Sequence, residues 1–333
     1  MSYKNENMKM IELHENGLDI RFRIRENGVV ELADFSSQEV KKAIMEPKED
    51  ICYPAVEIHR SGTGSLNMHA YKNNINQSSV DFVYENHELK EQDGGKELEI
   101  VMVSPEKLKA VYHMRLFDGV PAVQTWTEII NEGSEDQGLT YVSSFMYQGI
   151  SRGGEKPYYK KTDIYVPFNS WCCESQWQKY DAETLNLNGM VVDGFNHQGY
   201  GLNRYCYSGK GTWSTCEYLP MGIAEDRETG ETYIFQIESS GQWLAEYGSA
   251  QGGNLYLALS GATEQEHGWY KNLKPGESFT TVPAGAAVVK GGLNPAAAAL
   301  TRYRRKVRRP NTDDEKLNVV FNDYMNCLMG NPT

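Results

Sequence analysis

The sequence lacks the features that mark membrane-spanning or secreted proteins. It has no apolar run approaching the 18 or more residues that a membrane-spanning helix needs. Residues 1–15 are polar and contain no secretion-signal core. Only six cysteines are present, none in a Cys-x-x-Cys pair, and Cys172 and Cys173 are adjacent, which is typical of neither zinc sites nor ordinary disulfides. We therefore expect a protein of the reducing cytoplasm with no membrane contact.

Positive charge is also scarce. The chain carries 33 Lys and Arg against 45 Asp and Glu, a formal net charge of −12. Such a surface repels phosphate backbones, so we expect no nucleic-acid partner. One basic segment, between Arg302 and Arg309, runs against this trend. On a helix its side chains would spread around the circumference, where they can interact with the C-terminal end of that helix and with neighbouring acids.

Motifs for metal, phosphate or nucleophile chemistry are missing as well. The seven histidines are scattered, and no two are spaced three or four residues apart, so no metal site is expected. No Gly-x-Ser-x-Gly elbow is present, although spacing alone does not exclude a Ser-His-Asp triad. The glycine-rich loop Ser61–Ser65 lacks the Gly-Lys-Ser/Thr ending of a phosphate loop. The sequence thus predicts no cofactor.

The sequence does contain many short apolar segments separated by turns. Leu18–Ile24 alternates apolar and polar residues, as a half-buried strand does, and Asp118-Gly119 separates the strand-like runs Lys109–Phe117 and Val120–Ile130. The pattern continues to about residue 289, too far for a seven-stranded sandwich, so we predict two large sheets with about 15 to 20 strands. Further strands are predicted at residues 29–32, 98–103, 139–146, 190–192, 232–237, 255–259 and 278–289.

The pattern changes after Gly292. Residues 296–307 are helix formers without a breaker, with Asn294 expected as the N-cap and Pro295 at the first helical position. A linker is predicted at residues 310–314. Leu317–Phe321 is a short apolar run, of the kind found in buried parallel strands.

Polar residues follow that apolar run directly. Asn322, Asp323 and Tyr324 would stand at the C-terminal end of a parallel strand, where α/β domains carry their active sites. Amide and carboxylate groups can bind vicinal sugar hydroxyls, and an aromatic ring can cover the apolar face of a sugar. These three residues are the predicted substrate-binding residues, and a strand end that satisfies its own turn is the alternative.

Four segments follow one another along the chain in a characteristic order. Thr127–Gly133 is a strand-like segment that ends in Asn-x-Gly, and Leu273–Phe279 has the pattern Leu-x-Pro-Gly-Glu-x-Phe. Gly291–Asn294 leads into the predicted helix, and Val319–Tyr324 joins the apolar run to the polar residues after it. In this order the segments resemble glycoside hydrolase family 36, the α-galactosidase or melibiase type, where they would be a sandwich strand, the end of the sandwich, the connection to the barrel and the first barrel strand.

The resemblance implies an all-β fold with the start of a second domain. Residues 1–292 would form a galactose-mutarotase-like β-supersandwich, residues 293–316 a connecting helix and linker, and residues 317–333 the first strand of a truncated (β/α)8 barrel. The two catalytic Asp of the family would lie beyond Thr333, so no catalytic residue is expected in the chain. An α-galactoside or related oligosaccharide would bind through the complete enzyme, and a homo-oligomer is expected. Tyr324 replaces the usual Trp, which puts plain galactose as substrate in doubt.

Two other functions stay open. The 21 Tyr and 6 Trp, including Trp171, Trp177 and Trp213 in loop-like segments, would suit a stand-alone carbohydrate-binding module. A mutarotase-type sugar epimerase would need a His and a Glu in one cleft, for which His113 and Glu238 are possible partners. The loop beside Arg60 and His69 resembles a family loop that reaches a neighbouring subunit, although the family's Asp is absent.

Overall fold

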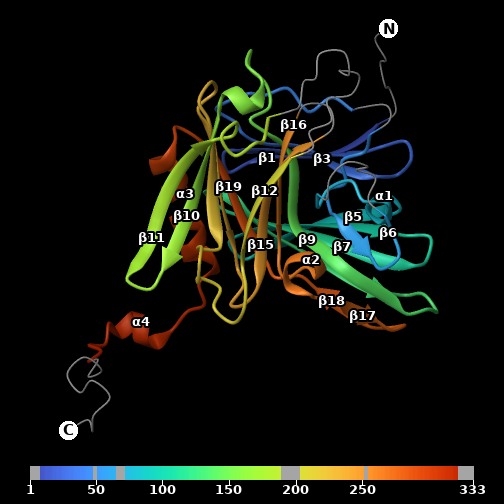
Figure 1. Cartoon of the computed structure of the whole chain (residues 1–333). Helices are drawn as coiled ribbons and strands as arrows, with labels where there is room; N and C mark the ends of the chain where they lie inside the picture. Colours follow the sequence, from blue (N-terminus) through green and yellow to red (C-terminus); the bar gives the residue numbers. More distant parts are fainter. Residues whose placement is uncertain (1–7, 48–50, 65–71, 189–202, 251–253, 322–333) are drawn as a thin grey trace.

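The protein is a large β-sandwich, in agreement with the prediction. The computed structural model describes residues 8–47, 51–64, 72–188, 203–250 and 254–321, which contain 19 strands and four α-helices (Figure 1). No helix within these ranges is both long and apolar enough to cross a membrane. The strand predicted at residues 190–192 lies outside the described residues.

The larger sheet has ten strands, nine of which form a continuous antiparallel path. Its short tenth strand, β18 (Ser278–Thr280), pairs with β8 beside the last residues of that strand. In order across the sheet the path is β11 (Cys173–Asp181), β10 (Thr162–Ser170), β13 (Met221–Asp226), β14 (Glu231–Ile237), β19 (Ala284–Lys290), β8 (Val120–Asn131), β7 (Leu108–Phe117), β6 (Gly95–Val103) and β5 (Val83–Gln92).

Two further sheets complete the sandwich. The three-stranded sheet consists of β1 (Lys9–Glu15), β2 (Leu18–Ile24) and β3 (Val30–Ser37). The six-stranded sheet has the order β12 (Arg204–Gly209), β15 (Trp243–Ala250), β16 (Asn254–Ser260), β9 (Gln137–Ile150) and β17 (Lys271–Leu273), with β4 (Ile58–Arg60) also on β9.

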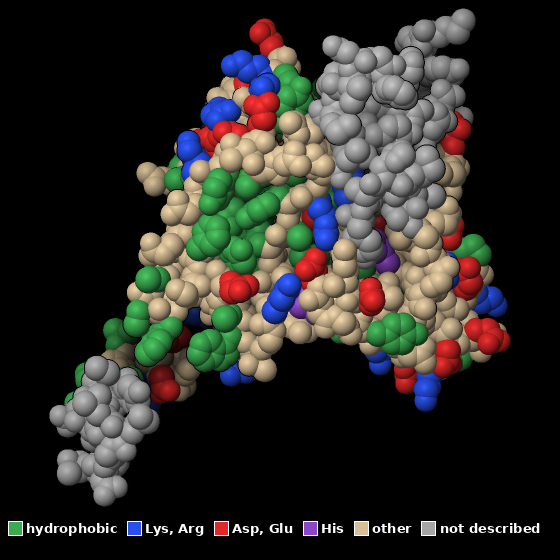
Figure 2. All heavy atoms as spheres, viewed as in Figure 1, with side chains coloured by type: hydrophobic (Ala, Val, Ile, Leu, Met, Phe, Trp, Pro, Cys, Tyr) green, Lys and Arg blue, Asp and Glu red, His purple; other side chains and the backbone are tan. Residues whose placement is uncertain are grey.

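The main core lies between the sheets. Along β7 every second residue from Leu108 to Leu116 is buried there, as period-two alternation requires. Aromatic side chains from all three sheets meet in this core; Phe35 packs edge-on against Phe145 and Tyr147, with ring centroids 5.5 and 6.1 Å apart. Hydrophobic side chains also reach the surface between the β10–β11 hairpin and β12 (Figure 2).

Helix α3 (Leu293–Val307) covers part of the outer face of the ten-stranded sheet. Ala296, Ala299, Leu300 and Tyr303 form a second core with side chains of that sheet. The other helical segments are short: α1 (Gln77–Val80), α2 (Glu264–His267), α4 (Thr312–Lys316) and a 3-10 turn at Tyr158–Lys160.

Three local predictions differ from the structure. The strand predicted at 278–289 is two strands, β18 and β19, because Pro283 has no N–H for the ladder and the chain steps along β8 there. The helix begins at Leu293 rather than Pro295, and its N-cap is Gly292, with no side-chain cap bond from Asn294. Helix α4 begins within the predicted linker and extends past it to Lys316, and Asn311 caps its first turn.

The apolar run at residues 317–321 is not a strand in this chain. Leu317 has a left-handed backbone with φ 50°, and Val319, Val320 and Phe321 are 98, 87 and 82% exposed. A buried parallel strand needs neighbours on both sides, and the described residues supply none here. The expected domain boundaries therefore stay predictions.

Candidate functional site

The predicted sugar-contact residues Asn322, Asp323 and Tyr324 lie outside the described residues, as does His69 of the glycine-rich loop. Arg60 beside that loop is described: it pairs with Glu106 at 2.9 Å and with Asp81 at 3.5 Å. These contacts tie β4 to neighbouring turns and give Arg60 a structural role.

The structure gathers a different set of polar groups on the ten-stranded sheet. Glu97 and Glu99 lie two residues apart on β6, so both side chains leave the outer face of the sheet while Leu98 and Ile100 enter the core. His113 of β7 stands directly opposite Glu99, and Trp126 of β8 stands opposite His113.

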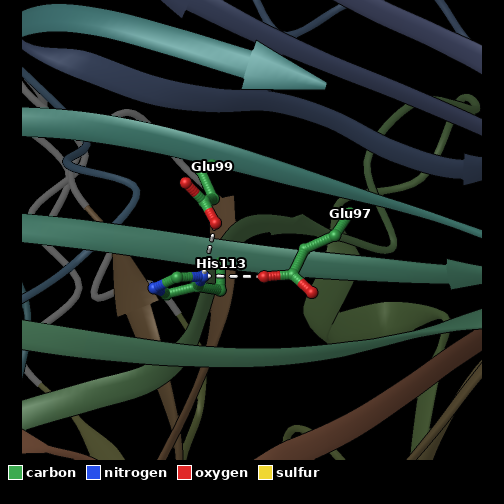
Figure 3. Close-up of side chains that lie close together, drawn as sticks. All are labelled: Glu97, Glu99 and His113. Carbon is green, nitrogen blue, oxygen red and sulfur yellow. Dashed lines mark hydrogen bonds and ion pairs between the residues drawn. The ribbon is translucent and has the colours of Figure 1, made fainter. Parts of the chain in front are cut away.

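The Nδ1 edge of the His113 imidazole faces both carboxylates (Figure 3). Its Nδ1 is 2.9 Å from Glu97 Oε1 and 3.8 Å from Glu99 Oε1. The His113 ring stacks on Trp126, with centroids 4.7 Å apart and planes 8° apart, which fixes its orientation. All three titratable side chains are largely shielded from solvent, with 10 to 22% of each exposed.

The remaining carboxylate oxygens already have partners. Gln92 donates to Glu97 Oε2 at 2.7 Å, and Lys90 lies 2.6 Å from Glu99 Oε2. The set could offer one imidazole nitrogen and two carboxylate oxygens to a divalent cation, since these atoms lie within 4.8 Å of one another. A cation would have to displace the His113–Glu97 hydrogen bond and tolerate the adjacent ammonium of Lys90. A cross-strand polar cluster explains the contacts better.

The cluster does not contain the His–Glu pair considered for a mutarotase. Glu238 accepts hydrogen bonds from Gln124 at 2.8 Å, from Gln236 at 3.0 Å and from Tyr303 of α3. His113 instead bonds Glu97. Glu238 therefore anchors α3 to the sheet.

The sequence contains a signal for this cluster in the register of the β6–β7 hairpin, not in the spacing of histidines along the chain. Ser104 and Leu108 pair across the three-residue turn Pro105–Lys107, and centring the hairpin on Glu106 places Glu99 opposite His113. Histidine pairs spaced three or four residues apart are a helical signal, so they cannot find a site that is assembled across strands.

A second buried polar cluster surrounds Glu57, which contacts the segment of residues 72–76. The Glu57 carboxylate accepts hydrogen bonds from Ser79 Oγ at 2.6 Å and from the backbone N–H groups of Ile75 and Asn76. Burial raises the pKa of Glu57 to about 7 and lowers the pKa of the nearby His59 to about 3. These contacts fasten the segment to β4, so the perturbed carboxyl has a structural explanation.

No protein-family model and no curated protein matches the sequence. Solved structures do match, and several are GH36 α-galactosidases. AgaB of Geobacillus stearothermophilus has a TM-score of 0.71 and 15% identity over 96% of this chain and 45% of its own. A variant of AgaA from the same organism, in complex with stachyose, has a TM-score of 0.69 and 16% identity over 92% and 44%.

An α-galactosidase from Lactobacillus brevis gives the same result, with a TM-score of 0.65 and 14% identity over 91% of this chain and 42% of its own. This chain thus spans less than half the length of the enzymes it resembles. At such identities the likeness establishes the fold: the large sandwich with its following helix.

Proposed function

We propose that the chain is the N-terminal sandwich domain of a glycoside hydrolase of the family 36 α-galactosidase type. The observation that carries the proposal is the match to AgaB over 96% of this chain and 45% of the enzyme. In this proposal residues 1–292 are the sandwich, residues 293–316 the connection, and residues 317–333 the start of the catalytic barrel.

The role proposed for the sandwich is to support that barrel and an oligomer rather than to catalyse. The nearly full exposure of Val319 and Val320 suits a strand whose neighbours belong to a barrel. Asn322, Asp323 and Tyr324 would then face an α-galactoside or related oligosaccharide, as neighbours crystallised with raffinose and stachyose bind such sugars. The five described cysteines are unpaired, which suits the cytoplasm.

The experiment is a pair of assays on the 333-residue chain. We expect neither hydrolysis of an aryl α-galactoside nor acceleration of galactose mutarotation, because the family's catalytic Asp pair is not matched in this sequence and His113 is paired with Glu97. Turnover in the first assay would overturn the non-catalytic role, and mutarotation abolished by His113→Ala would move the chain to the epimerases.

A further inference from the structure

Within the described residues, each of the two large sheets has an edge strand on the same side of the sandwich, where the rings of Phe168, Tyr218 and Tyr207 pack together. There the ten-stranded sheet ends with β11 and the six-stranded sheet with β12. Ile164 and Val166 of β10 are buried in the core, and their cross-strand partners on β11 are Tyr180 and Gln178. Because opposite residues share a face, Tyr180 and Gln178 continue the inner face of the sheet beyond the closed part of the sandwich.

Strand β12, the edge strand of the six-stranded sheet, also directs tyrosine side chains inward. Tyr205 and Tyr207 lie opposite Tyr247 and Ala245 of β15, which belong to the main core, so they also point inward. Tyr207 is fully packed, and Tyr205 is only partly buried. Burial raises the pKa of Tyr205 to about 12, with smaller contributions from Tyr218 and Tyr180.

We call Phe168, Tyr180, Tyr205, Tyr218 and Gln178 the tyrosine patch. Phe168 and Tyr218 pack together with ring centroids 5.2 Å apart, and Tyr218 lies 5.4 Å from Tyr207. Figure 2 shows hydrophobic surface between the β10–β11 hairpin and β12, and patch residues lie on these three strands. Its residues are uncharged, and each except Gln178 packs against the main core.

The hydroxyl groups of the tyrosines along this edge differ in their hydrogen bonding. Within the described residues, no hydrogen bond involves the hydroxyl of Tyr180, Tyr205 or Tyr218. Tyr207, deeper in the core, donates to the carbonyl of Met221 at 2.8 Å. A tyrosine that is half buried in protein usually directs its polar end to a partner or to water.

Two exposed tryptophans lie on loops beside the patch. Trp171, at the tip of the β10–β11 hairpin, is 89% exposed, and Trp213, on the loop after β12, is 70% exposed. Asn169 joins the two loops: its N–H donates to Glu217 O at 2.8 Å, and its Oδ1 accepts from Ser175 N at 2.9 Å. The loops are thus held in place rather than free, with their indole rings open to solvent.

We propose that the tyrosine patch, with Trp171 and Trp213 at its border, is a binding surface for a neutral oligosaccharide. A pyranose ring offers an apolar C–H face to an aromatic ring and a rim of hydroxyls to phenol and amide groups, and the patch supplies both. The absence of charge in the patch favours a neutral sugar over an acidic one. This inference concerns the sandwich alone and does not depend on the proposed barrel.

A second copy of the chain, paired along β11, is the alternative occupant of this edge. Strand β11 carries Glu174 and Lys179 on its exposed length, and charged side chains on an edge strand disfavour addition of another strand. Phenol groups that have no hydrogen-bond partner among the described residues would also stay unpaired in an apolar dimer interface, at a cost in free energy. Both features favour a hydrated, hydroxyl-rich ligand.

The test is calorimetric titration of the 333-residue chain with stachyose, with chemical shifts of the indole N–H groups as a second readout. We expect saturable binding with a Kd of about 1 mM, and Tyr180→Ala combined with Trp171→Ala to weaken it at least about tenfold. Tyr205→Phe keeps the ring and should weaken binding less. Tyr270→Ala removes a 54% exposed ring away from the patch and should change nothing.

Two results would overturn the inference. One is no saturable binding to the folded chain, or binding that the patch variants leave unchanged while their melting temperatures match the wild type. The other is concentration-dependent dimerisation that the same variants abolish, which would assign the patch to a second copy of the chain.

Discussion

Individual buried carboxylates set much of the local structure. Glu31 is fully buried and pairs with Arg23 at 2.6 Å and with Arg25 at 3.1 Å, while Glu246 pairs with Arg204 at 2.8 Å. Glu57 has only neutral donors, so burial dominates and favours its protonated form. Sequence alone could not distinguish these three glutamates, because their partners lie far along the chain or in another strand.

The pH dependence of folding tests the Glu57 environment. Its pKa is about 7 in the folded protein against an ordinary 4.5, so the folded state holds this proton more tightly. Its contribution to stability is full below pH 4.5 and is lost as the pH rises through about 7, by on the order of 3 kcal/mol. Glu57→Gln should therefore gain stability relative to wild type between about pH 5 and pH 8, measured by urea unfolding.

An exposed carboxyl provides the control for that measurement. Glu155 is exposed, and Glu155→Gln should leave the pH profile of the free energy of unfolding parallel to that of the wild type. Parallel profiles for Glu57→Gln as well would contradict the raised pKa.

Metal removal tests the cluster of Glu97, Glu99 and His113. Because Gln92 and Lys90 already engage the outer carboxylate oxygens, we expect EDTA to leave the melting temperature unchanged. A fall in melting temperature with EDTA that Zn²⁺ restores, and that His113→Gln abolishes, would instead make the cluster a metal site.

At the level of elements, hairpins were the most predictable part of the fold. The run Leu18–Ile24 corresponds residue for residue to β2, and the Asp118-Gly119 turn joins β7 to β8 as expected. These strands bury one face in the core, so apolar and polar residues alternate along their sequences. Strand β15 was missed because Trp243–Ala250 is buried on both faces, so its sequence does not alternate.

Helix α3 depends on a close contact with the sheet. Tyr303 lies over Gly285 of β19, and a Cβ there would stand 2.5 Å from the Tyr303 ring. Gly285→Ala should push Tyr303 from its place and lower the free energy of unfolding by about 1 to 3 kcal/mol, measured by chemical denaturation.

A glycine in open space gives the matched control for the helix. Apart from Gly241 itself and its two chain neighbours, no heavy atom of the described residues lies within 4 Å of a Cβ built at Gly241, so Gly241→Ala should be close to neutral. Equal effects of the two substitutions would show that the Tyr303 contact does not hold α3 on the sheet.

At the scale of the whole molecule, the sequence predicted a mostly β supersandwich, and the structure confirms a large β-sandwich with a following helix. The open edge between β11 and β12 could not be predicted, because it depends on how two sheets end relative to one another. The proposed site at Asn322, Asp323 and Tyr324 stays a prediction, since its partners would come from a barrel.

The most direct test of the account is α-galactoside turnover, measured side by side for the 333-residue chain and for AgaB of Geobacillus stearothermophilus as the positive control. The account predicts turnover by AgaB and none by the 333-residue chain, because retaining hydrolysis needs a pair of carboxyl groups about 5 Å apart across the scissile bond and the account assigns no such pair to the sandwich. Turnover by the 333-residue chain would contradict the central claim.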